Sequence, residues 1–302
     1  MLTKRQIDQR KTNIGASEMS AICGLSPFSN AYDVWARKTN LIPTHDISDH
    51  EAIQIGNALE PAMLPWLAGH LGPIDRRGLE RRVPGTHLLV HLDAKTDTGQ
   101  PIEIKTTGFV GPIVGDWGED GTDQIPPWVC IQVQTQMMAV DSPDAYVGAW
   151  LGHRGRHLYH LPRSEKLCQI IAERARAFWK CIESGTPPAD SLISTNVAKQ
   201  IDREEWKCAR IDTDLMDEWR ACNDAKKAWT KREELAKRKI LTAMGTAQIG
   251  DAGGSGIVTY RESQVSTLDR EKLKKKFPDA WSECLTKVPR PIFRYRRPGK
   301  TE

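Results

Sequence analysis

The sequence contains no apolar run long enough to cross a membrane, and its first eleven residues, MLTKRQIDQRK, lack the apolar region of a signal peptide. Its seven cysteines include no CxxC pair, which argues against an iron–sulfur cluster or a structural zinc site. An odd number of unpaired thiols is typical of a reducing compartment. These absences predict a soluble cytoplasmic protein without disulfides.

The 302 residues are enough for a full hydrophobic core and an appended segment. The net charge is only +4, but residues 270–300 carry eleven basic and three acidic side chains, and the remainder is slightly acidic. A basic end on such a body indicates contact with a polyanion. A solvated tail that only aids solubility is the alternative.

Residues 87–105, HLLVHLDAKTDTGQPIEIK, form the stretch around which the rest is organised. The apolar run at 88–92 predicts a buried strand, Thr98-Gly99 predicts a turn, and 101–105 predicts a second strand. We therefore expect a hairpin at the centre of the fold.

Side chains alternate along a strand, so Glu103 and Lys105 share one face while Ile102 and Ile104 share the other. Asp93 stands where the first strand ends, which brings two carboxylates and a lysine toward one sheet edge. Such a group suits a hydrated Mg²⁺ ion and metal-assisted phosphodiester hydrolysis. An ordinary solvated hairpin would show the same residues, so both interpretations stay open.

The residues before the hairpin predict three helices, one of which carries Tyr32, Val34 and Trp35. Ser17 is a candidate N-cap and Gly24 a helix stop, and the helix start between them suits a phosphate, with Arg10 about two turns earlier. A plain cap and a surface arginine are the alternative. Residues 51–72 predict a longer helix with Glu60 among apolar residues, a costly position unless the carboxylate is paired or binds metal.

We expect a break or a new first turn near Glu60 in this longer helix, because Pro61 and Pro65 are unfavourable in a helix interior. Residues 108–125 predict a loop over the site. Residues 128–140 predict a helix with Gln132 and Gln136 away from its apolar stripe.

Residues 145–151 and 156–161 predict an antiparallel strand pair, and an amphipathic helix capped by Ser164 follows, with six apolar residues inward: Leu167, Ile170, Ile171, Phe178, Trp179 and Ile182. His153, His157 and His160 are interpreted as surface residues rather than a metal site, because no cysteine or carboxylate motif accompanies them. We place a domain boundary near residue 188, between a core at 1–188 and a helical and basic extension at 189–302. The extension contains a long charged helix over 212–244, a flexible loop at 250–256 and a strand at 257–261.

Taken in order, several motifs resemble the YqaJ-type viral recombinase family, whose members are nucleases similar to lambda exonuclease within the PD-(D/E)XK superfamily. The motifs are IGASE at 14–18, GLSPF at 24–28, IGNALEP at 55–61, LDAK at 92–95, IEIKTT at 102–107 and IQVQTQM at 131–137. Two positions depart from the pattern: relatives often have Asp-Gly where this chain has Asp93-Ala94, and Pro65 is atypical of the helix.

The resemblance implies an α/β (α+β) fold with a restriction-endonuclease-like core, in which helices flank a central mixed sheet. It also implies a Mg²⁺-dependent exonuclease, with Mn²⁺ able to substitute, that digests linear double-stranded DNA from 5′ to 3′ in phage-type recombination by single-strand annealing. Relatives act on DNA ends as homo-oligomers, often ring-like trimers, beside a single-strand annealing protein. The expected location is the cytoplasm of a bacterial host, with a phage or prophage origin.

The resemblance also implies roles for single residues. The metal ligands would be Glu60, Asp93, Glu103 and the carbonyl of Ile104. Lys105 would orient the water and stabilise developing charge, and Gln132 would support the site. Arg10 and Ser17 would anchor the 5′-phosphate of the DNA.

Two other functions remain open. The chain could be a phage-type endonuclease of the same superfamily; a CRISPR-linked nuclease would usually need a four-cysteine cluster, which is absent. It could also be a non-catalytic DNA-binding assembly protein with a decayed site, although the acidic and lysine positions are all present.

Overall fold

The computed structural model describes residues 9, 12–43, 49–76, 79–204, 207–262 and 267–286. The chain divides into two compact units, Met1–Asp202 and Arg203–Glu302. The sequence places a boundary near residue 188, whereas residues 189–202 pack on the first unit. Val197 is buried in the core of that unit, and the Ser191 hydroxyl accepts a hydrogen bond from the Tyr32 backbone amide at 3.0 Å.

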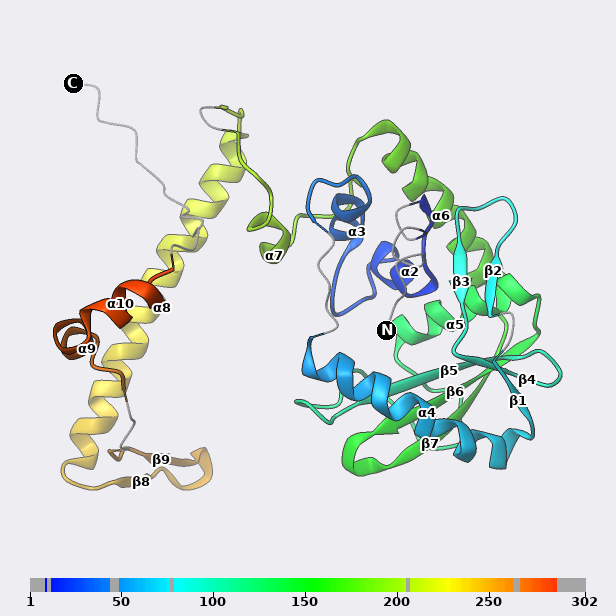
Figure 1. The fold of residues 1–302 in the computed structure, drawn as a ribbon. Helices are drawn as coiled ribbons and strands as arrows, with labels where there is room; N and C mark the ends of the chain where they lie inside the picture. Colours follow the sequence, from blue (N-terminus) through cyan, green and yellow to red (C-terminus); the bar gives the residue numbers. More distant parts are fainter. Residues whose placement is uncertain are drawn as a thin grey trace. The chain divides into compact units, whose positions relative to one another are not determined.

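A five-stranded sheet in the order β1-β4-β5-β6-β7 forms the centre of the first unit (Figure 1). The strands are β1 (Ile74–Asp75), β4 (Ala94–Thr96), β5 (Pro101–Thr107), β6 (Asp144–Leu151) and β7 (Arg156–Pro162). Strands β5 and β6 are parallel, and the other neighbours are antiparallel. This mixed sheet flanked by helices confirms the predicted α/β fold class, and the predicted antiparallel pair β6–β7 is confirmed as well.

The sheet lies between two helices, α4 (Glu51–Leu71) and α5 (Pro127–Val140). Ile102 and Ile104 of β5 pack with Met63 and Leu67 of α4 in one apolar cluster. Alternate residues of β6 face α5 and belong to a second cluster, which contains Val129, Val133, Met137, Ala145, Val147, Ala149 and Leu151. The period-two pattern of the strands thus separates two cores, one on each side of the sheet.

Gly148 permits the close approach of α4 to the sheet. A Cβ atom at this position would lie 2.8 Å from Cδ2 of Leu67. Leu67 is fully buried, so any side chain at residue 148 would push the helix away from β6.

The central hairpin differs from the predicted one in its first strand. The turn at Thr98-Gly99 is confirmed, with Gly99 at φ 95°, but it joins β4 to β5. The predicted strand at 88–92 is β3 (Leu89–His91), which pairs with β2 (Glu80–Arg82) in a separate two-stranded sheet. Val90 is fully buried and packs with Ala16 of the N-terminal helix, so this strand serves a different core from that of β5.

Helix α4 is continuous, and the predicted break near Glu60 is wrong. Pro61 and Pro65 lie inside the helix, and their missing N–H groups leave the carbonyls of Asn57 and Pro61 without helical partners. These residues lie on the exposed side of α4, where water satisfies the freed carbonyls without cost to the core.

The N-terminal helices α2 (Ala16–Ile22) and α3 (Ala31–Lys38) pack with α6 (Glu165–Ser184) in a third apolar cluster. Ser17 is not the N-cap of α2, as the sequence predicts. Gly15 takes that position, and its N–H donates to Oε2 of Glu18 at 2.8 Å. The Ser164 cap of α6 is confirmed, and the helix ends at Gly185.

Six apolar residues of α6 are predicted to face inward. For Ile170 this prediction is wrong, because 41% of its surface is exposed.

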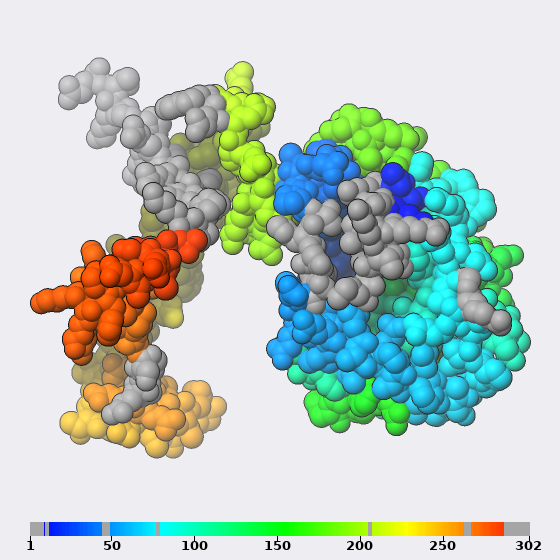
Figure 2. Space-filling model, in the orientation of Figure 1, coloured from blue at the N-terminus to red at the C-terminus, as the bar shows by residue number. Residues whose placement is uncertain are grey.

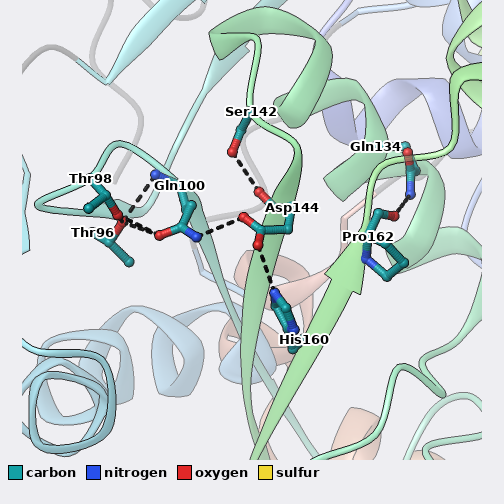
Figure 3. A network of polar contacts seen from close by, with 8 residues as sticks. All are labelled: Thr96, Thr98, Gln100, Gln134, Ser142, Asp144, His160 and Pro162. Carbon is teal, nitrogen blue, oxygen red and sulfur yellow. Dashed lines mark hydrogen bonds and ion pairs between the residues drawn. The ribbon is translucent and has the colours of Figure 1, made fainter.

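A polar network ties the ends of the central strands together (Figure 3). The carboxylate of Asp144, at the start of β6, accepts a hydrogen bond from Nε2 of Gln100 at 2.8 Å and lies 3.0 Å from Nε2 of His160. Nε2 of Gln134 donates to the carbonyl oxygen of Pro162 at 2.9 Å. Asp144 therefore joins the turn before β5 to β7, and His160 contacts this carboxylate rather than the other two histidines of the predicted surface group.

The second unit consists of α8 (Thr213–Met244), a hairpin of β8 (Ile249–Asp251) and β9 (Ile257–Thr259), and the short helices α9 (Arg270–Lys276) and α10 (Pro278–Cys284). The predicted long helix is confirmed, while the predicted loop at 250–256 contains the end of β8 and a 3-10 turn. None of these elements contains a buried residue. The basic residues from 287 onward lie outside the described part.

The short helix α7 (Thr195–Ala198) completes the described helices of the first unit. In the space-filling view, the light-blue α4 lies low on the visible face of this unit (Figure 2). Across the described ranges, no helix combines the length and apolar character that a membrane span requires.

Candidate active site

Asp93 lies in the bend between β3 and β4. Its Oδ2 atom accepts a hydrogen bond from the backbone N–H of Ile104 at 2.8 Å. This contact crosses from the bend to the middle of β5, so the Asp93 carboxylate lies beside the strand that carries Glu103 and Lys105. Asp93 therefore approaches Glu103 and Lys105 from the bend between β3 and β4, and not from a strand paired with β5.

Glu103 projects from β5 toward α5 and is only 2% exposed. Its Oε1 atom accepts from Nζ of Lys105 at 2.5 Å and from Nε2 of Gln132 at 2.7 Å. Nζ of Lys105 also donates to Oε1 of Gln132 at 3.0 Å. The three side chains form a closed triangle, in which the amide of Gln132 accepts from the lysine and donates to the carboxylate.

Gln136 is a site residue that sequence reasoning missed. It is fully buried, and its Nε2 atom donates to Oε2 of Glu103. The signal was the spacing of four residues from Gln132, which places both amides on one face of α5. Each oxygen of the Glu103 carboxylate is thus held by an amide from that helix.

Glu60 projects from α4, and its carboxylate forms an ion pair with Arg76. The Nη2 atom of Arg76 lies 2.7 Å from Oε1 of Glu60, and its Nε donates to the backbone oxygen of Asp93 at 3.2 Å. Arg76 therefore links α4 to the bend that contains Asp93. The sequence analysis does not predict a role for this arginine.

The charges of the site change two pKa values in the same direction for different reasons. Burial, followed by the negative charge of Glu103, raises the pKa of Asp93 to about 8. For Lys105, burial lowers the pKa, but the charges of Glu103 and Asp93 outweigh it and raise the pKa above its ordinary value. The lysine is thus held as an ammonium group, while the two carboxylates repel each other.

This donor set fits Mg²⁺, because that ion binds oxygen ligands and needs only one or two carboxylates while it retains water. Burial, and then the negative charge of Glu103, raise the pKa of Asp93, and a cation between the two carboxylates would offset both the lost hydration and the repulsion. Glu60 also contributes to this rise, although it is paired with Arg76. Within the described part of the chain, no three His, Cys, Asp or Glu side chains are gathered closely enough to form a ready-made metal site.

The predicted phosphate anchor consists of Ser17 and Arg10. Ser17 lies exposed in the first turn of α2, and Arg10 lies outside the described residues. The carbonyl of Ile104 is a predicted metal ligand. The backbone N–H of the same residue donates a hydrogen bond to Asp93, so this part of the backbone lies at the candidate site.

Comparisons with known proteins agree with the motifs. Residues 7–142 match the family model described as YqaJ-like viral recombinase domain. The chain is 21% identical to the uncharacterized protein YqaJ of Bacillus subtilis strain 168, over 91% of this chain and 88% of that protein.

Two solved structures are also similar. One is an alkaline exonuclease from Laribacter hongkongensis, with 17% identity, a TM-score of 0.48 and coverage of 61% of this chain and 94% of that chain. The other is a phage-related exonuclease from Haemophilus somnus 129PT, with 15% identity, a TM-score of 0.44 and coverage of 57% and 94%.

The matched region begins before α2 and ends at α5, so it contains every acidic, lysine and glutamine residue of the candidate site. Residues 7–142 are therefore similar to the YqaJ-like viral recombinase domain, the family that the sequence motifs predict.

Proposed function

We propose that this chain is a Mg²⁺-dependent deoxyribonuclease that digests linear double-stranded DNA from its 5′ ends. One observation carries the proposal: Asp93, Glu103 and Lys105 are brought together within hydrogen-bonding networks at one point of β5. The family match to a viral recombinase domain supports a task in phage-type recombination by single-strand annealing.

Each residue has a role that follows from its contacts. Mg²⁺, or Mn²⁺ in its place, would be held by Asp93 and Glu103 and would polarise the scissile phosphodiester. Lys105, an ammonium group paired with Glu103, would orient the attacking water and stabilise charge that develops on the phosphate oxygens. Gln132 fixes the lysine ammonium and the carboxylate relative to each other.

Two further metal ligands belong to the proposal. Glu60 would hold the ion through a carboxylate oxygen, and the carbonyl of Ile104 would complete the protein ligands. Arg76 contacts Oε1 of Glu60, so the carboxylate could keep this ion pair while Oε2 holds the ion.

The DNA end would be held by Arg10 and Ser17 through the 5′-phosphate. We further propose double-stranded DNA ends and a single-strand annealing protein as partners, a homo-oligomer as the working form, and the cytoplasm of a bacterial host as its location. These points follow from the resemblance of the matched domain to phage recombination nucleases.

End-labelled linear duplex and closed circular duplex, each with and without Mg²⁺, provide the test. We expect loss of the linear substrate only, only with Mg²⁺ or Mn²⁺, and faster with a 5′-phosphate than with a 5′-hydroxyl. Arg10→Ala and Ser17→Ala should reduce this preference. Cleavage of the closed circle would indicate an endonuclease, and an absence of cleavage with DNA binding retained would indicate a non-catalytic assembly protein.

A further inference from the structure

Phe28 exposes a large aromatic ring next to the candidate site. It lies in the loop between α2 and α3, and 68% of its surface is exposed. A single exposed apolar residue is common on protein surfaces and means little by itself. The position of this ring relative to Lys105 is what distinguishes it.

A short row of contacts leads from Lys105 to Phe28. Nζ of Lys105 lies 5.5 Å from the ring centroid of Trp128. The ring of Phe28 meets that of Trp128 edge to face, with centroids 5.5 Å apart and an interplanar angle of 86°. Adding these two 5.5 Å distances bounds the separation between Nζ of Lys105 and the Phe28 ring at about 11 Å.

Trp128 belongs to the same face of α5 as the two site glutamines, because it precedes Gln132 by four residues and Gln136 by eight. One helix face therefore holds the carboxylate of Glu103 and also supports the Phe28 ring. The aromatic contact is continuous with the candidate site rather than a separate surface patch.

The loop holds Phe28 in a fixed place. Gly24 has φ +74°, and the backbone N–H of Phe28 donates to Oγ of Ser26 at 3.2 Å. Asn30 ends the loop by capping α3, and its Nδ2 donates to the carbonyl oxygen of Leu192 at 2.8 Å. A loop tied at both ends loses little entropy when its exposed ring binds a ligand.

We propose that Phe28 is a stacking platform for a nucleobase of the DNA strand whose phosphodiester lies at Lys105. The inference rests on the proposed function and adds to it the contact that holds the base. Bases stack on aromatic rings without regard to sequence. Because phosphates repeat about every 3.4 Å along one strand, a separation of about 11 Å corresponds to at most roughly three nucleotides. The ligand is a terminal or unpaired nucleotide, since only such a base offers a free face.

Two substitutions at Phe28 and one control test the proposal in the full-length protein. Phe28→Leu retains an apolar contact with Trp128 but removes the aromatic face, and Phe28→Trp restores one. Leu25→Ala changes another exposed apolar side chain of the same loop. For Phe28→Leu, we expect KM for linear duplex to rise roughly 10-fold, with kcat within a factor of two, because base–aromatic stacking has about this magnitude. Phe28→Trp and Leu25→Ala should keep the wild-type KM.

A binding measurement separates this proposal from the proposed function. A single-stranded oligonucleotide containing 2-aminopurine should lose fluorescence on binding, and Phe28→Leu should abolish most of that quenching while Phe28→Trp keeps it. If Phe28→Leu matches the wild type in both KM and quenching, the stacking proposal is overturned, even when the wild type cleaves DNA. If the wild type does not cleave, quenching that depends on Phe28 still supports the platform, and only the proposed activity fails. An equal effect of Leu25→Ala would show a loop-wide change and would also overturn it.

Discussion

Strand β5 has one face toward α4 and the other toward α5, and the two faces differ in composition. On the α4 side, Ile102 and Ile104 pack against Met63 and Leu67 in a wholly apolar cluster. On the α5 side, Glu103 and Lys105 meet a pair of glutamine side chains. Adjacent residues of one strand thus face an apolar core and a polar site.

The comparison shows how a single strand serves stability and chemistry at once. Burial of the α4-side residues removes apolar area from water and stabilises the fold. The α5 side contains the buried carboxylate of Glu103 next to Asp93, whose pKa is raised first by burial and then by the charge of Glu103. Such an arrangement costs stability and is retained where function requires it. Substitutions on the two faces should therefore have opposite effects on stability and activity.

The largest effect is expected from Glu103→Gln. It removes the charge that would bind the metal, so hydrolysis of linear duplex should fall roughly 10³-fold, the scale of losing a central electrostatic contact in an active site. The variant should remain folded with a lowered melting temperature, because Lys105 loses its charge partner. Initial rates with saturating Mg²⁺ measure the effect, and Glu51→Gln, an exposed change at the start of α4, is the matched control. A rate near that of the wild type would show that the polar face of β5 is not the active site.

Lys105→Ala should be next. The ammonium group acts on the transition state, so kcat should fall roughly 10²- to 10³-fold while metal and DNA binding are retained. Single-turnover kinetics and DNA binding of the same preparation provide the measurement. A loss of DNA affinity with turnover intact at saturation would instead make Lys105 a phosphate contact.

The α4 side should respond in the opposite way. Leu67→Ala removes a fully buried side chain that lies against Gly148, so the free energy of unfolding should fall by about 3 kcal/mol. Thermal or urea unfolding measures this, and Gln54→Ala on the exposed side of α4 should change little. The activity of the folded variant, measured well below its melting temperature, should stay within a factor of two. A large loss of activity in Leu67→Ala would contradict the separation of stability and activity between the two faces of β5.

Gln136→Leu sharpens the comparison within the polar face. It leaves Oε2 of Glu103 without its amide donor, and loss of a partner that orients a metal ligand typically weakens metal affinity about 10- to 100-fold. Mn²⁺ titration followed by electron paramagnetic resonance measures the affinity directly. Gln134→Leu is the control on the same helix, because Gln134 bonds to Pro162 and Ser164 instead. The control should lower stability and leave Mn²⁺ affinity unchanged; the same loss in both variants would assign Gln136 a purely structural role.

A pH dependence of stability is expected in the metal-free protein. The pKa of Asp93 is raised from 3.8 to about 8, so the native state holds a proton that the unfolded state has released between these values. Stability from this group is therefore greatest near pH 4 and declines as the pH rises toward 8. Asp93→Asn should flatten the decline and raise the melting temperature by a few degrees near pH 8. Unfolding in EDTA across this range checks it, and an unchanged slope in the variant would contradict the assignment.

The sequence by itself determined the parts of the fold that depend on local periodicity. Alternation along residues 101–105 is enough to place Glu103 and Lys105 on one face, because successive side chains of any strand point to opposite sides. The helical spacing in 127–140 likewise puts Gln132 and Gln136 together. The family motifs predict the acidic residues and the lysine of the site, because these residues occupy fixed positions within short sequence segments.

Only the tertiary structure decided which segments meet. The run at 88–92 has the composition of a strand, but nothing in it selects β2 over β5 as its partner, since register and pairing depend on the cores that each strand covers. Glu60 needs a partner by its position, yet Arg76 is identified only when the chain after α4 turns back. Two prolines are tolerated in α4 because their freed carbonyls face water, and exposure of one helix side is a property of packing. The contact of Gln136 with Glu103 also depends on tertiary packing, because α5 must lie over β5 in the register that brings these two side chains together.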